Sequence, residues 1–100
     1  MATLPESVSI RGSLKAGMYT AQLGVALNVS RSSLELTAPG RSFRIDRENL
    51  RGMADTSVLG IFKRGIHFIH QQPGLPNTIV FYPAADRDHV RRALADLGWG

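Results

Sequence analysis

Residues 22–30 read QLGVALNVS, and this stretch decides the class of fold. Apolar side chains occupy alternate positions from Leu23 to Val29, and small or polar residues stand between them. Because successive side chains of a strand point to opposite faces, this period predicts a strand buried on one face. Leu23 is expected to lie inside with the other apolar side chains of the stretch.

Two similar segments follow. After the turn residues RSS, residues 34–37 (LELT) return with leucines on one side, so they are expected to form a hairpin with the first strand. Residues 42–46 (SFRID) come next, with Phe43 and Ile45 on one face and polar side chains on the other. These segments predict an antiparallel meander.

Residues 47–62 carry a mixed pattern. Leu50 and Met53 have helical spacing, but the intervening Gly52 argues against a long helix. We expect a strand or a short turn here, with a loop at residues 54–57 (ADTS).

Two further strands are expected at residues 65–70 (GIHFIH) and 78–82 (TIVFY), because the prolines of QQPGLPN between them forbid a continuing helix. On a strand, His67 and His70 point to opposite faces. They therefore cannot hold one metal ion together, and no metal site is expected. Apolar residues occupy both alternating sets of positions in TIVFY, so both faces of this strand are expected to be covered.

The last segment has the period of a helix with one apolar face. The apolar residues at this spacing are Val90, Ala93, Leu94 and Leu97. Asp86 is the expected N-cap, and Gly98 stands where a left-handed C-terminal cap occurs. Trp99 follows, and its ring is expected to fold back onto the edge of the core.

The expected architecture is α+β: one domain over residues 1–100, with six or seven short antiparallel strands followed by a C-terminal α-helix that covers the sheet. The 100 residues suffice for one core, and 43% of them are hydrophobic. No run approaches the length of a membrane span. The first ten residues contain no lysine, no arginine and no apolar run, so we expect a cytoplasmic protein.

The residue types argue against several kinds of chemistry. The chain contains no cysteine, which removes disulfides and thiolate nucleophiles. No G-x-S-x-G elbow or G-x-G-x-x-G loop occurs, so neither an enzyme nor a cofactor is expected. The net charge is +4, but the arginines are scattered rather than clustered, which argues against nucleic acid as the partner. A small hydrolase or a nucleic-acid binder is therefore the least favoured class.

The runs FRIDRENLRGMADTSVLGIFKRGIHFIH (43–70) and NTIVFYPAADRDHVRRAL (77–94) resemble bacterial pleckstrin-homology-like domains. The resemblance rests on strand pattern, turn glycines and a final helix, and covers about the last 60 residues. It implies a bent seven-stranded antiparallel barrel or sandwich that the helix closes. Lipid-binding members carry a basic signature across the first hairpin. Arg11 and Lys15 stand in that region here, but the Arg/Lys-x-Arg pair is missing.

One basic cluster is a candidate site for an anion or a lipid head group. Its residues are Arg41, Arg44, Arg47, Lys63 and Arg64. The favoured function is a non-catalytic binding or scaffolding module that engages a protein partner, either by strand addition at an open sheet edge or by pairing with its own copy as a homodimer. The alternative is a module that binds phospholipid head groups at the inner face of the membrane through this cluster.

Overall fold

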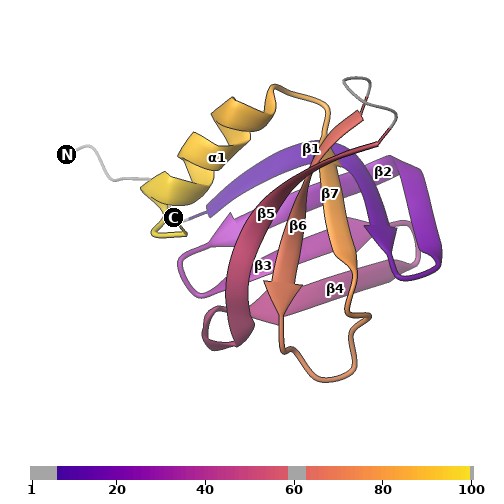
Figure 1. The fold of residues 1–100 in the computed structure, drawn as a ribbon, viewed down its shortest axis with the longest axis horizontal. Helices are drawn as coiled ribbons and strands as arrows, with labels where there is room; N and C mark the ends of the chain where they lie inside the picture. The colour runs from indigo at the N-terminus through magenta and orange to yellow at the C-terminus, as the bar shows by residue number, and fades with distance from the viewer. Residues whose placement is uncertain (1–6, 59–62, 100) are drawn as a thin grey trace.

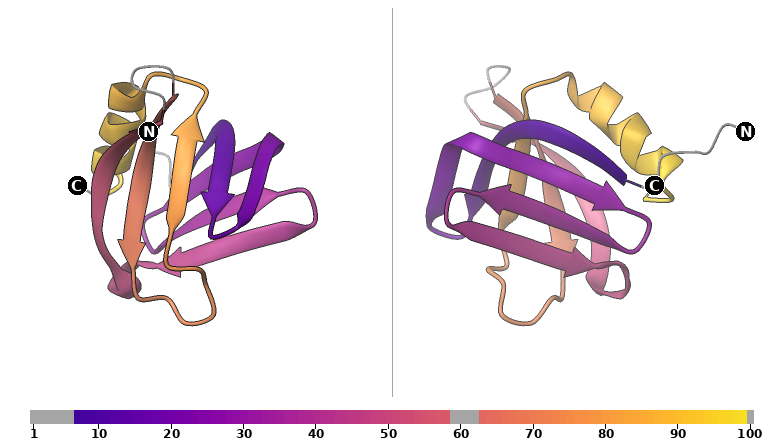
Figure 2. Two further views of the ribbon diagram at one scale, coloured as in Figure 1. Left: turned by 45° about the vertical axis from the view of Figure 1, so that its right-hand side comes forward. Right: turned by 180° about the vertical axis from the view of Figure 1, so that it is seen from behind.

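The computed structural model describes residues 7–58 and 63–99. In chain order the elements are β1 (Ser7–Ala16), β2 (Tyr19–Ser30), β3 (Ser33–Ala38), β4 (Arg41–Asp46), a short 3-10 helix (Arg47–Asn49), β5 (Leu50–Val58), β6 (Lys63–His70), β7 (Ile79–Pro83) and α1 (Arg87–Asp96). Within these residues the strands form one antiparallel sheet in the order β4-β3-β2-β1-β7-β6-β5. The sheet curls into a half-barrel, and α1 lies across one end of it (Figures 1 and 2). The predicted α+β class is confirmed.

Strand β1 joins the two halves of the sheet. On one side it pairs with β2, and on the other side residues Gly12 to Ala16 pair with β7. This second pairing connects the start of the described chain to a strand more than sixty residues later. Consecutive strands otherwise pair as the meander predicts, except that β4 and β5 are joined through the 3-10 helix and lie at opposite ends of the sheet order.

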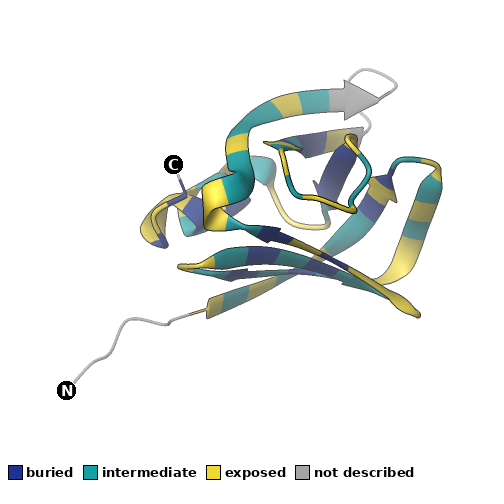
Figure 3. Ribbon diagram, turned by 90° about the horizontal axis from the view of Figure 1, so that it is seen from below, coloured by how far each residue is buried: buried dark blue, intermediate teal, exposed yellow. Residues whose placement is uncertain are grey.

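The core lies on the concave face of the half-barrel, where the buried positions gather (Figure 3). The largest fully buried side chains are Phe68, Phe81, Leu27, Leu34, Leu36, Ile45, Ile66, Ile79, Leu94, Val29 and Val90. They come from β2, β3, β4, β6, β7 and α1 in alternating strand positions or on one helical face. Burial of this apolar area is the main stabilising contribution to the fold.

The expectation that Leu23 is buried is wrong, because its side chain is 84% exposed. Leu14 pairs with Ala21 and Gly12 pairs with Val25, so three residues of β2 lie opposite Ser13 alone. Such a bulge pushes the extra residues out of the ladder and bends the strand. Gly24 has a φ of 72°, which a residue with a side chain adopts only with strain.

The loop expected at residues 54–57 is also wrong, because these residues belong to β5. Ala54 pairs with His67 and Asp55 pairs with Ile66, and the ladder continues in register to Val58. Cross-strand hydrogen bonds to β6 outweigh the low strand propensity of alanine and aspartate. The start of β5 follows the 3-10 helix and carries a register shift at Arg51.

The two strands predicted late in the chain are present. Ile66 and Phe68 are fully buried, whereas Ile69 is 44% exposed, so β6 alternates as expected. His67 and His70 accordingly lie on opposite faces. His70 accepts a hydrogen bond from the Gln72 backbone N–H at 2.9 Å and contacts the Pro76 carbonyl at 2.8 Å. Strand β7 is buried on both faces from its first residue to Tyr82, as predicted.

Helix α1 and its ends follow the predicted pattern. Asp86 occupies the N-cap position, although its side chain makes no capping hydrogen bond. Gly98 has a φ of 88°, and its backbone N–H donates to the Ala95 carbonyl at 2.9 Å. Trp99 is 4% exposed, so its ring does fold back onto the core. Among the described residues, no helix has both the length and the apolar character needed to cross a membrane.

A side-chain contact ties the β6–β7 loop to the segment between β4 and β5. The Gln72 side-chain oxygen accepts hydrogen bonds from the Asp46 backbone N–H at 2.9 Å and from Asn49 Nδ2 at 2.8 Å. Since β4 does not pair with β5 or β6, this contact joins strands that the sheet order keeps apart.

We expect Gln72→Ala to lower the free energy of unfolding by about 1–2 kcal/mol, because two donors in a partly buried place lose their acceptor. Urea unfolding followed by circular dichroism measures the change. Gln71→Ala is the matched control: Gln71 is exposed and its side chain accepts one hydrogen bond, from Arg51. An equal loss in the two variants would contradict the structural role given to Gln72.

Candidate functional site

The arginines predicted to form a patch around β4 point in different directions. Arg44 lies on the outer face, and its Nε is 3.1 Å from a carboxylate oxygen of Asp46. Arg41 lies at the other end of β4 with its guanidinium 4.8 Å from the centre of the Tyr19 ring. Each cation therefore already has a partner within the protein.

Arg47 belongs to the 3-10 helix and holds the C-terminal turn in place. Its Nη1 donates to the Arg31 carbonyl at 2.8 Å, and its Nη2 donates to the Gly98 carbonyl. The guanidinium also lies over the Trp99 ring, 5.0 Å from its centre. The side chain thus connects residues that are far apart in sequence, and its first role is structural.

Lys63 and Arg64 begin β6 at the end of that strand remote from β4 (Figure 1). Strands β3, β2, β1 and β7 stand between β4 and β6 in the sheet order. The backbone positions of the five predicted residues are therefore spread around the half-barrel rather than gathered on one patch.

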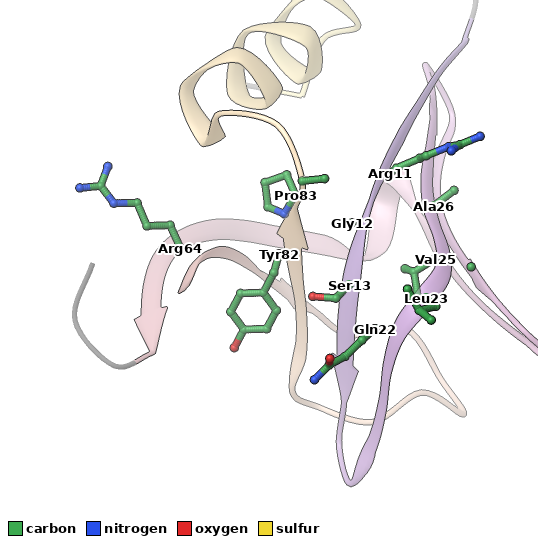
Figure 4. Close-up of a pocket in the computed structure, with 12 residues that line it drawn as sticks. Arg11, Gly12, Ser13, Gln22, Leu23, Val25, Ala26, Arg64, Tyr82 and Pro83 are labelled. Carbon is green, nitrogen blue, oxygen red and sulfur yellow. The ribbon is translucent and has the colours of Figure 1, made fainter. Parts of the chain in front are cut away.

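A broad hollow of about 800 Å³ lies beside the β2 bulge (Figure 4). Its walls come from β1, the bulge of β2, the start of β6 and the end of β7. Arg11 and Arg64 stand on its two sides and point away from one another, while Ser13, Gln22 and Tyr82 lie between them (Figure 4). Since its charged groups diverge, the hollow does not hold an anion between them.

A smaller groove of about 370 Å³ lies between the start of β5 and the C-terminal end of α1, and we call it the β5–α1 groove. Its lining residues are Arg47, Leu50, Arg51, Gly52, Met53, Arg91, Gly98 and Trp99. Three arginines thus share one small space with apolar side chains. This combination suits a ligand that is anionic and also has apolar surface.

Backbone and amide groups hold Arg51 within the groove. Its Nη1 donates to the Glu48 carbonyl at 2.8 Å, and its Nη2 donates to the Gln71 side-chain oxygen at 2.8 Å. Both acceptors are neutral, so neither cancels the positive charge. The register shift at Arg51 takes this residue out of the regular ladder, which is a common way to redirect a side chain.

Arg91 reaches the groove from α1 and also contacts β5. Its Nε lies 3.3 Å from a carboxylate oxygen of Asp55, and Arg87 lies 3.7 Å from the same oxygen. One carboxylate therefore serves two guanidinium groups. The Asp55 side chain is 48% exposed, so water screens these ion pairs and each contributes little to stability.

The β5 strand runs along the groove and has one free edge. In the described part of the chain β5 pairs only with β6. At its far end Arg87 donates to the Thr56 carbonyl at 3.2 Å, so the helix already occupies that carbonyl. The start of β5, from Leu50 to Met53, is the part of the strand that lines the groove.

Sequence reasoning missed Arg51 and Arg91 as site residues. Of the five predicted residues, only Arg47 lines the β5–α1 groove. Arg91 lies off the apolar face of the helix, and nothing in the local sequence pattern connects it with β5. The groove is assembled from residues 47–53 and 91–99, which are far apart in the sequence, so only the folded chain brings its cations together.

Comparison with known proteins found no matching family model, no similar curated protein and no similar solved structure.

Proposed function

We propose that this chain is a non-catalytic binding module of the pleckstrin-homology-like type, which engages a protein partner at the β5–α1 groove. The partner segment lies extended along the free edge of β5 and places side chains into the groove. Backbone hydrogen bonds supply part of the affinity and the groove supplies selectivity.

The observation that carries this proposal is that an unpaired strand edge and a groove occur at the same place. The larger hollow beside the β2 bulge also mixes polar and apolar side chains, but its arginines point away from one another (Figure 4). Beside β5, apolar Leu50 and Met53 lie next to three cations. Binding sites for peptides combine an apolar floor with a small number of placed polar groups.

The pleckstrin-homology-like assignment is supported by the curled seven-stranded antiparallel sheet and the C-terminal helix at its end. Fold alone does not select a ligand. The lipid-binding alternative depends on the cluster of Arg41, Arg44, Arg47, Lys63 and Arg64. It receives less support because the described members of that cluster diverge.

A large uncharged side chain placed in the β5–α1 groove tests whether the partner binds there. A Cβ added at Gly52 would meet only Ile69 Cδ1, at 4.0 Å, so a side chain can start from this lining position without a clash at its Cβ. We expect Gly52→Phe to reduce capture of the partner from a cell lysate by about tenfold or more, because the ring occupies the groove. Quantitative mass spectrometry of the captured proteins measures the loss.

Gln22→Phe is the matched control, since it adds the same ring at an exposed position on the β2 bulge, beside the other hollow. Circular dichroism checks that both variants are folded. Amide hydrogen exchange of the complex should show slower exchange in β5. If Gly52→Phe captures the same proteins in the same amounts as the unchanged chain, the β5–α1 groove is not the binding site.

A further inference from the structure

The charges of the β5–α1 groove point to the chemistry of its ligand. Within residues 7–58 and 63–99 the ion pairs are Arg44–Asp46, Arg87–Asp55 and Arg91–Asp55. Arg47 and Arg51 take part in none of them. Two of the three guanidinium groups of the groove therefore have no carboxylate partner among these described residues, and the third shares its carboxylate with Arg87.

These cations are held in place before any ligand arrives. Arg47 is fixed by two carbonyl groups and by the Trp99 ring, and Arg51 is fixed by the Glu48 carbonyl and Gln71. A guanidinium group has more N–H donors than the two that each of these side chains uses. Because these side chains are already ordered, binding of an anion does not include the entropic cost of ordering them.

The surroundings of the cations favour a peptide over a free inorganic anion. Leu50, Met53 and Trp99 line the same groove, and apolar side chains contribute nothing to binding an isolated phosphate. A peptide has a backbone for the β5 edge, apolar side chains for this floor and carboxylates for the arginines. An extended chain also places alternate side chains on one side, so acidic and apolar residues can face different parts of the groove.

We infer that the β5–α1 groove selects a short, extended, acidic peptide segment whose carboxylates contact Arg51 and Arg91. This inference rests on the proposed function and adds the substrate class to it. Arg51 and Arg91 line the groove from β5 and from α1, so an extended segment with two or more carboxylates can contact both elements. Arg47 contributes its positive charge while it keeps its structural contacts.

Asp55 is the internal competitor for this ligand. Its carboxylate occupies Arg91 in the free protein at 3.3 Å, so an entering carboxylate must share or replace that contact. Removing the charge of Asp55 frees Arg91 for the ligand. Asp55→Asn is therefore expected to strengthen binding of an acidic peptide, which is the opposite of what a merely damaged groove would produce.

The test uses the full 100-residue chain and two synthetic peptides of alternating Glu and Val or alternating Gln and Val. Isothermal titration and two-dimensional NMR report the affinity and the residues whose signals move. The Glu peptide should bind about tenfold more tightly than the Gln peptide at low salt, and added salt should reduce this difference. Signals of β5 and of the C-terminal end of α1 should shift.

The arginine variants complete the test. Arg51→Gln and Arg91→Gln should each weaken binding of the Glu peptide by about fivefold, and Asp55→Asn should strengthen it by a few fold. Arg92→Gln is the matched control, because Arg92 is the neighbouring exposed arginine on α1 and does not line the groove. It should leave the affinity within about twofold of the original value.

Several results would overturn the inference. If both peptides bind equally and shift the groove signals, selection of an acidic segment fails while the proposed function stands. If neither peptide binds, but inorganic phosphate or phosphatidylserine vesicles bind and lose affinity on Arg91→Gln, the ligand is an anion other than a peptide. A separate result tests the proposed function itself. That function fails if the Gly52→Phe variant captures the same proteins in the same amounts as the unchanged chain.

Discussion

Replacing Trp99 by alanine is expected to lower the free energy of unfolding by about 3–5 kcal/mol, a large part of the roughly 5–15 kcal/mol that stabilises a typical domain. The ring is 4% exposed and belongs to the core cluster. Its Nε1 donates to the Ser30 carbonyl at 2.6 Å, and the Arg47 guanidinium covers one face. The substitution removes all three contributions and leaves a cavity between the C-terminal turn and the end of β2.

Thermal or urea unfolding followed by circular dichroism measures this loss, since Trp99 is the only tryptophan and its fluorescence disappears in the variant. Trp99→Phe separates the contributions in part, because it keeps one aromatic six-membered ring and removes the N–H donor with the remainder of the indole. We expect it to cost about 1–2 kcal/mol. A Trp99→Ala protein as stable as the original would show that the C-terminal turn does not close the core.

Replacing Gly12 by alanine is expected to cost about 3 kcal/mol or more, because overpacking against fixed backbone cannot relax by rotation of a side chain. The added Cβ would lie close to the Tyr82 carbonyl oxygen and 2.7 Å from Cζ of Phe81. Gly12 pairs with Pro83 at the junction of β1 and β7. Relief of the clash requires these two strands to separate, and their pairing connects the two halves of the sheet.

Gly52→Ala is the matched control for Gly12→Ala. Both glycines are in strands and neither has a positive φ, but Gly52 has open space around the added atom. We expect Gly52→Ala to change the free energy of unfolding by less than about 1 kcal/mol, with either no loss or a small gain from the reduced freedom of the unfolded chain. Urea unfolding of both variants checks the pair, and equal losses would refute the steric argument.

Most of the strands and the helix were predictable because their patterns are local. The alternation through β3 and β4 places Leu36 and Phe43 on the inner face, and the structure confirms both of them. The spacing from Val90 to Leu97 likewise predicts the buried face of α1. In these segments the side chains that decide the conformation are a few positions apart, so the period can be read directly.

The errors occurred where a distant strand decided the outcome. Leu23 stands two positions before the buried Val25, so simple alternation would place it inside. The bulge in the pairing of β1 with β2 turns it outward instead. Residues 54–57 have low strand propensity, but β6 supplies a complete partner for them. In both places backbone hydrogen bonds between segments outweigh what the local residues prefer.

The candidate site shows the same limit more strongly. The sequence suggested that the turn at Lys63 and Arg64 lies near Arg44, which faces outward from its strand, yet strands of the sheet separate β4 from β6. The groove instead collects Arg47, Arg51 and Arg91. Two of these are near one another in the chain, but the third arrives on a helix whose position depends on the burial of Val90 and Leu94.

By itself the sequence determined the class of fold, the alternation of most strands, the terminal helix and the inward return of Trp99, because short-range periodicity governs all of these. Only the tertiary structure decided the outward turn of Leu23, the length of β5 and the composition of the β5–α1 groove. The physical reason is that these features depend on pairing and packing between segments tens of residues apart. Such contacts stabilise the protein only after distant segments have come together. A short stretch of the sequence therefore does not reveal them.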